Sequence, residues 1–133
     1  MTNKSKKILS EISAGELIDK MSILEIKLDK IKSKNSQDEI SKEYKMLKET
    51  RDLNIKMTEK IIELSKEIKK VNLSLWNIED QIRICERDKN FGKEFIELSR
   101  SVYLNNDKRA KIKSDINEML GSNIKEIKQY SDY

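Results

Sequence analysis

Several residue types are absent or rare in this sequence, and each absence narrows the possible fold and chemistry. The 133 residues include no proline and only three glycines, so little interrupts long helices. Without histidine, a Ser-His or Cys-His dyad and a typical zinc site are excluded. The single cysteine, Cys85, excludes an intramolecular disulfide, and we interpret it as a buried packing residue. Any catalysis would therefore rest on carboxylates, with a hard metal such as magnesium.

Aromatic residues and long apolar runs are also scarce, which limits the classes of partner. Aromatics make up 5% of the chain, and no apolar run approaches the ~20 residues of a membrane span. The basic residues near the start lead into "ILSEISAGE", which is too polar for a signal peptide, and we expect no membrane partner. Because Cys85 is the only cysteine, we expect a cytoplasmic protein. The net charge is +4, but only Lys4, Lys6 and Lys7 cluster, which argues against nucleic acid as a partner.

The residues that are present predict one all-α domain over residues 1–133. Charged residues reach 39%, yet the apolar residues recur at strict helical spacing. A first helix is predicted over about 14–33, because Ser13 and Glu16 form a capping box before the apolar pattern begins. Residues 1–12 are expected to be flexible. A further helix over about 93–120 should end at Gly121, followed by a short tail, 122–133.

The middle of the chain predicts one very long helix over about 37–88, with Ser36 and Glu39 as its capping box. Nine apolar positions between Met57 and Cys85 alternate at spacings of four and three, which is typical of coiled-coil-like packing. Between 48 and 56 this pattern is out of step, and polar residues fall on the extrapolated core positions.

Two architectures are compatible with these lengths. In the first, about three main helices form long antiparallel hairpins, and a homodimer with four-helix cross-sections covers the isoleucines that lie off the main apolar stripes. Those isoleucines are Ile18, Ile23, Ile26, Ile55, Ile62 and Ile96. In the second, the long helix breaks near 50–55 and the chain folds into a compact four-helix monomer. We prefer the first, because neither proline nor glycine marks the break.

The second half of the chain contains a polar patch that interrupts the helical pattern. Four of the five arginines lie within 27 residues, and Asn105 and Arg109 fall on core positions. Antiparallel pairing would place Asp80 level with Arg100, and Trp76 near Asn105. The candidate ligand-binding residues are Trp76, Asp80, Arg83, Arg100, Tyr103, Asn105, Asn106, Asp107 and Arg109.

This patch has three interpretations. The first is a structural network of salt bridges and hydrogen bonds that fixes the helix register. The second is a site for a small anion such as phosphate, which arginine can bind through two parallel hydrogen bonds. The third is a metal site built from Glu79, Asp80, Glu86 and Asp107, as in the all-α nucleotide pyrophosphohydrolases, although their E-x-x-E and E-x-x-D pairs are not reproduced.

The segments "ISAGELIDKMSILEIKL" and "LWNIEDQIRICERDKNFGKEFIELSRSVYLNNDKRAKIKSDINEMLGS" together resemble a bacterial family of small proteins that is defined as a domain of unknown function. The resemblance implies that the polar patch belongs to the family's signature, and it implies no activity. We therefore expect a non-enzymatic helical protein without a cofactor, which binds a protein partner or a small anion. The alternative is a magnesium-dependent, pyrophosphohydrolase-like enzyme.

Overall fold

The computed structural model describes residues 6–133, which form four helices and no strand. These are α1 (Ala14–Lys30), α2 (Lys34–Asn54), α3 (Glu59–Arg87) and α4 (Lys93–Leu120). The all-α prediction is confirmed for this part of the chain. Residues 1–5, with Lys4 of the basic cluster and part of the segment expected to be flexible, lie outside the described residues.

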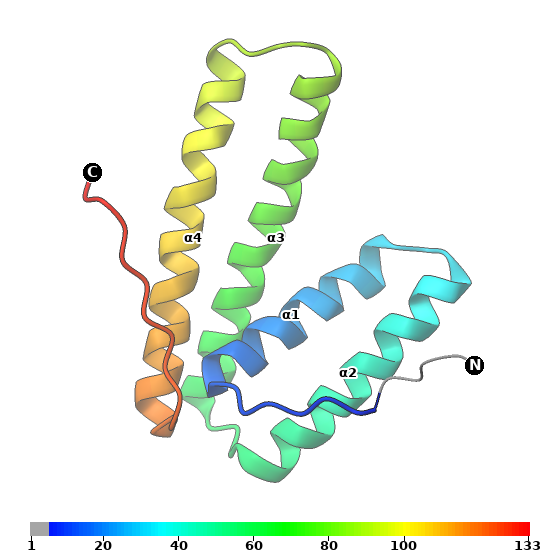
Figure 1. The fold of residues 1–133 in the computed structure, drawn as a ribbon, viewed down its shortest axis with the longest axis vertical. Coiled ribbons are helices and arrows are strands. Elements are labelled where there is room, and N and C mark those ends of the chain that lie inside the picture. The colour runs from blue at the N-terminus through cyan, green and yellow to red at the C-terminus, as the bar shows by residue number, and fades with distance from the viewer. Residues whose placement is uncertain (1–5) are drawn as a thin grey trace.

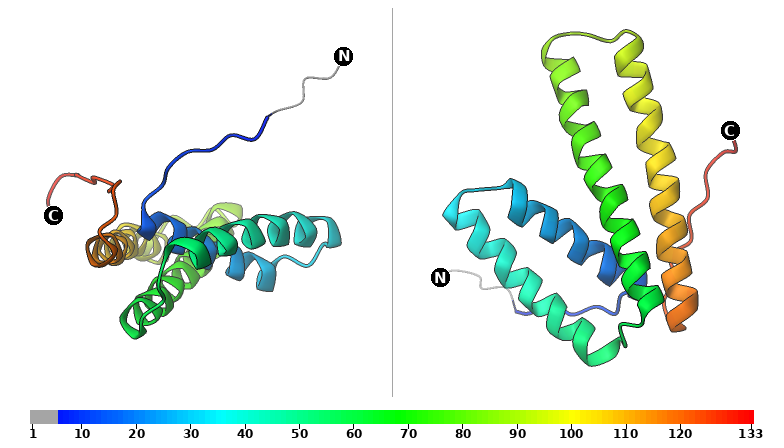
Figure 2. Two further views of the ribbon diagram at one scale, coloured as in Figure 1. Left: turned by 90° about the horizontal axis from the view of Figure 1, so that it is seen from below. Right: turned by 180° about the vertical axis from the view of Figure 1, so that it is seen from behind.

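The four helices form two antiparallel hairpins that meet at one end (Figures 1 and 2). The α3–α4 hairpin is the longer one, and α1 packs across its lower half before it diverges from it (Figure 1). Among the described helices, α2 contacts only α1, whereas α1 contacts all three others. The residues after α4 run back along α4 as an extended tail (Figure 1). Helix α1 therefore joins the two hairpins.

The helix ends follow local capping chemistry, with one departure from the sequence prediction. The Ser13 hydroxyl accepts a hydrogen bond from the Glu16 amide at 3.1 Å, as predicted. Gly121 ends α4 with a positive φ of 59°, also as predicted. Helix α2, however, begins at Lys34, because Ser33 caps it and accepts from the Ser36 amide at 3.2 Å. Ser36 is therefore the cap's partner and not the cap.

The prediction of one helix over 37–88 is wrong, and the alternative with a break near 50–55 describes the chain better. Helix α2 ends at Asn54, and Thr58 begins α3 by accepting a hydrogen bond from the Ile61 amide at 3.3 Å. Two residues at the break, Ile55 and Met57, pack against the core. The apolar pattern is out of step at 48–56 because the chain leaves one helix and enters another there.

The core lies where α1 crosses the α3–α4 hairpin. It consists of Ile18, Ile61, Leu64, Ile68 and Ile116, all buried. Helix α1 is enclosed between α2 and the α3–α4 hairpin, which buries apolar residues on more than one of its faces. Ile18 and Ile26, which seemed to require a second copy for burial, are thus covered within one chain, whereas Ile62 and Ile96 remain exposed.

Helix α2 is the least buried of the four, because it has no buried residue. Pairs such as Lys20–Glu43, at 3.7 Å, connect it to α1. No helix within residues 6–133 has both the length and the apolar content that a bilayer crossing requires.

Candidate functional site

The start of α1 docks closely on the end of α4 through the backbone of α1. The Gly15 amide donates to the Asn117 Oδ1 atom at 2.7 Å, and the Ala14 amide donates to the Ser122 hydroxyl at 3.1 Å. The first backbone amides of a helix have no hydrogen-bond acceptor within that helix. Here the acceptors come from Asn117 of α4 and from Ser122, which follows α4. A Cβ atom on Gly15 would lie 2.6 Å from the Lys113 carbonyl oxygen. Glycine thus permits the close approach that places α1.

One turn further along α1, the buried carboxylate of Asp19 connects three helices. The Arg109 guanidinium donates to both carboxylate oxygens, from Nε at 2.9 Å and from a terminal nitrogen at 2.6 Å. The Asn72 amide nitrogen donates to Asp19 and to the Ser22 hydroxyl, both at 2.8 Å. We call these four residues the Asp19 network. Its paired, hydrogen-bonded geometry is what permits a charge to be buried here.

The electrostatics of Arg109 agree with this geometry. The pKa of Arg109 is raised, chiefly by its hydrogen bonds to Asp19; burial acts in the opposite direction, and the Asp19 charge adds a smaller upward contribution. The Asp19 side chain is 1% exposed, whereas that of Arg109 is 29% exposed. The guanidinium is therefore held against α1 while one edge of it reaches the surface.

A second ion cluster surrounds Lys113, beside the Asp19 network. Its Nζ atom donates to Glu16 at 2.7 Å and to Glu126 of the tail at 2.8 Å, and lies 3.9 Å from an Asp19 oxygen. Burial alone would lower the pKa of Lys113, but the hydrogen bonds to Glu126 and Glu16 raise it above its ordinary value. The same contact lowers the pKa of Glu126. This cluster attaches the tail to the junction of α1 and α4.

A pocket opens beside the Asp19 network, where α1 diverges from α3. Its volume is about 430 Å³, and we call it the junction pocket. It contains four of the nine predicted ligand-binding residues: Trp76, Asp80, Arg83 and Arg109. The other lining residues are Ile23, Ile26, Asn72, Leu75 and Glu79. The pocket thus combines an apolar wall, an indole and charges of both signs.

The remaining five predicted residues do not line this pocket. Arg100 is exposed on α4, and the Asn105 amide donates to the Ser101 carbonyl of its own helix at 2.8 Å. The Tyr103 ring packs edge-on against Tyr133 with a centroid distance of 5.2 Å. Asn106 is half-buried, and Asp107 accepts a hydrogen bond from the Tyr133 hydroxyl. Much of the predicted patch on α4 therefore contacts its own helix or the tail.

The comparisons with known proteins give one match. A family model described as a family of unknown function, DUF6165, matches residues 8–132. The chain belongs to this family. No curated protein and no solved structure matches it. Membership in DUF6165 supplies no activity, so the function has to be argued from the site.

The acidic residues proposed as metal ligands are not brought together. Within residues 6–133, no three residues among histidine, cysteine, aspartate and glutamate form a group that could hold a metal ion. Glu79 and Asp80 line the junction pocket, but Glu86 and Asp107 do not. Glu79 instead lies 3.8 Å from Arg83, one turn along the same helix. The predicted four-carboxylate site is therefore not formed by the described residues.

The residues that sequence reasoning missed are those that connect α1 to α3 and α4. The sequence pattern does not single out Asp19, Asn72 or Lys113, and it identifies Glu16 only as part of a capping box. One signal was available, since Asp19 is a carboxylate between apolar residues such as Ile18 and Met21 on a helix with apolar residues on several sides. A charge in such surroundings indicates a buried partner.

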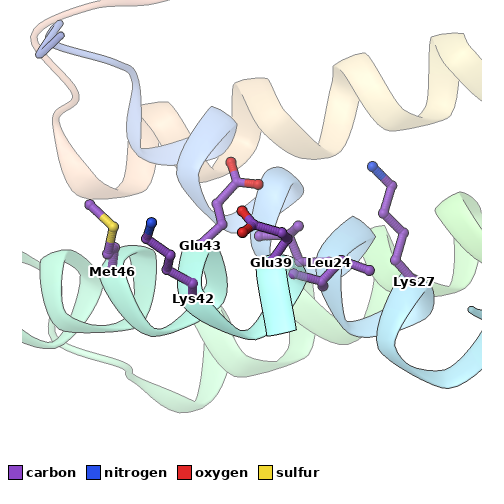
Figure 3. A pocket seen from close by; sticks show the side chains of 7 residues that line it. Leu24, Lys27, Glu39, Lys42, Glu43 and Met46 are labelled. Carbon is purple, nitrogen blue, oxygen red and sulfur yellow. The ribbon is translucent and has the colours of Figure 1, made fainter. Parts of the chain in front are cut away.

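A further groove lies between α1 and α2, away from the Asp19 network. It is lined by Leu24, Lys27, Glu39, Ile40, Lys42, Glu43 and Met46, whose side chains are shown in Figure 3. Its volume is about 350 Å³. Among the residues shown, charge and aliphatic groups alternate as on an ordinary helix surface, so the junction pocket is the better candidate site.

Proposed function

We propose that this DUF6165 protein is a non-enzymatic helical interaction protein, and that it binds another protein through the half of the α3–α4 hairpin that extends beyond α1. We call this part, residues 73–104, the distal hairpin. The observation that carries the proposal is that six large apolar side chains are exposed on a layer only two helices thick. These are Leu73, Ile84, Phe91, Ile96, Tyr103 and Leu104. A part of a protein that exposes several large apolar side chains is a candidate binding surface.

The rest of the fold supports this role by holding the hairpin at a fixed angle. Gly15 allows α1 to pack closely against α4. The Asp19–Arg109 ion pair then fixes the alignment of the two helices, because a shift would leave the buried carboxylate unpaired. The distal hairpin then projects from a rigid base, which reduces the conformational entropy lost when a partner binds. Trp76, at the edge of the junction pocket, offers the kind of aromatic anchor that dominates protein interfaces.

The small-anion interpretation has less support. Arg109, its main candidate residue, already uses two nitrogens on Asp19. Glu79 and Asp80 add negative charge to the same pocket, which disfavours a phosphate or carboxylate. The magnesium-dependent enzyme has less support still, because the four acidic residues it requires are not gathered. A cytoplasmic location is part of the proposal and is supported by the single cysteine of the chain.

Site-specific photo-cross-linking in the source cell tests the proposal. A photoreactive residue is placed at Leu73 or Ile84, each 38% exposed, and at Glu49 on α2 as a control. We expect a discrete cross-linked protein product from positions 73 and 84, and none from position 49. Absence of a product at the distal positions, or equal products at all three, contradicts the proposal.

A further inference from the structure

We infer that the partner of the distal hairpin is a second copy of this chain, which packs antiparallel on an exposed stripe of α3 formed by Trp76, Asp80, Arg83 and Arg87. This inference rests on the proposed function and specifies its partner. The spacings of four, three and four place these side chains on one face of the helix. Asp80, Arg83 and Arg87 are exposed, and Trp76 is half-buried.

The charged side chains of the exposed stripe form only weak ion pairs within the chain or none. Arg83 pairs only with Glu79 of its own helix, at 3.8 Å, and its side chain is 79% exposed. Arg87 pairs with the adjacent Asp88 at 3.2 Å, also at the surface. Within residues 6–133, Asp80 forms no ion pair. Exposed pairs within a helix are weak, so these side chains can exchange partners at little cost.

The order of residues along the stripe is self-complementary under a two-fold axis. Such an axis, perpendicular to α3 between Gln81 and Ile82, relates positions that are equally distant from it. Asp80 and Arg83 are equally distant, so Asp80 faces the partner's Arg83, and the same contact recurs on the other side. Trp76 and Arg87 are also equally distant, so each indole faces the partner's Arg87. The symmetric pairing therefore forms two ion pairs and two cation–π contacts.

Apolar side chains flank the stripe where a second copy would cover them. Leu73 is seven residues from Asp80 and Ile84 is four residues from it, so both lie on the same side of α3 as the stripe, two turns and one turn away from Asp80. Each is 38% exposed in the single chain. The interface would thus have a charged, register-setting centre and apolar flanks, as in antiparallel helical dimers.

The equivalent stripe on α4 lacks this complementarity. Ile96, Arg100, Tyr103 and Asp107 also follow the spacing of four, three and four. A two-fold axis there would place Ile96 against the partner's Asp107 and Arg100 against the partner's Tyr103, with no ion pair. Tyr103 and Asp107 are moreover in contact with Tyr133 of the tail. The two-fold contact is therefore assigned to α3.

Charge exchange tests the contact without disturbing the core, because the residues exchanged are exposed. Sedimentation equilibrium of the wild type should give twice the 15.7 kDa chain mass. Asp80→Arg and Arg83→Asp should each weaken dimerisation by about tenfold or more, since each places like charges opposite one another. The double variant, Asp80→Arg with Arg83→Asp, should recover dimerisation. An equimolar mixture of the two single variants should form a heterodimer, because one protomer then carries two arginines and the other two aspartates.

The control variant is Arg100→Asp, an exposed arginine on α4, which should leave dimerisation unchanged. Circular dichroism should be the same for all variants. A wild type that stays monomeric, or a dimer that neither single variant weakens, overturns the inference. If the chain is monomeric and position 84 cross-links to a different protein, the second-copy inference fails while the proposed function stands. If no protein cross-links at positions 73 and 84, the proposed function fails as well.

Discussion

Arg109 of α4 and Asp19 of α1, ninety positions apart in the chain, form a two-nitrogen, two-oxygen ion pair at the junction of the hairpins. The carboxylate is enclosed and the guanidinium is only partly exposed. Asn72 of α3 completes the arrangement. The position of Arg109 on the buried face of α4 is therefore explained by its pairing with a buried aspartate on α1. This polar contact fixes how α1, α3 and α4 are aligned with one another.

Replacing Arg109 by leucine should strongly destabilise the fold. The change leaves Asp19 buried without its cation, which costs about 3–5 kcal/mol of unfolding free energy. The double variant, Asp19→Leu with Arg109→Leu, should lose less than the sum of the single changes, because neither charge remains. Urea denaturation measures all three. Arg100→Leu, on the exposed face of the same helix, is the control and should change stability by about 0.5 kcal/mol or less. An unchanged Arg109→Leu variant would contradict the structural role.

Gly15 and Gly92 provide a matched test of close helix packing. Gly15→Ala places a Cβ atom 2.6 Å from the Lys113 carbonyl oxygen, so α1 and α4 must separate, at a cost of about 1–3 kcal/mol. Gly92→Ala meets only the Asn90 Oδ1 atom, at 3.5 Å, and should be tolerated. Thermal unfolding of both variants gives the comparison. Equal losses of thermal stability for the two variants would show that α1 and α4 do not pack closely at Gly15.

Much of the fold could be predicted from the sequence because its signals are local. Ser13 caps α1 through the amide three residues later, and Gly121 ends α4 through its own backbone conformation. The break between α2 and α3 was harder to predict. It depends on Thr58, which caps α3, and on Ile55 and Met57, which are partly buried against a core built from α1, α3 and α4.

The candidate site was only partly predictable because its contacts are not local. Trp76, Asp80 and Arg83 share one helix face, so their spacing alone brought them together. The pairing of Asp19 with Arg109 depends on α1 folding back onto α4, and that in turn depends on the break after Asn54. A model with an unbroken middle helix could not place α1 beside α4, so the acid that satisfies Arg109 was missed.

The contact of Glu126 with Lys113 should make attachment of the tail dependent on pH. The folded-state pKa of Glu126 is lowered below its ordinary value of 4.5, chiefly by the hydrogen bond from Lys113. Its stabilising effect is therefore fully present above pH 4.5 and is lost as the pH falls through the lowered pKa. Glu126→Gln should cost about 0.2–1 kcal/mol at pH 7, because the Glu126 side chain is half-exposed. The difference in unfolding free energy from wild type should begin to shrink as the pH falls below about 4.5, and it should disappear once the pH is below the lowered pKa of Glu126. A difference that stays constant would show that the ion pair does not hold the tail.

Phosphate and magnesium should leave the thermal stability of the protein unchanged. Arg109 is already bound by Asp19, and the acidic pocket residues Glu79 and Asp80 oppose an anion. Melting temperatures in inorganic phosphate should match those in chloride at equal ionic strength, because a ligand that does not bind the folded state cannot stabilise it.

Magnesium with nucleoside triphosphates should produce neither stabilisation nor release of pyrophosphate. A saturable rise in melting temperature with phosphate that Arg83→Gln abolishes would instead establish an anion site in the junction pocket. Arg100→Gln, outside the pocket, is the matched control, and it should leave any such rise intact.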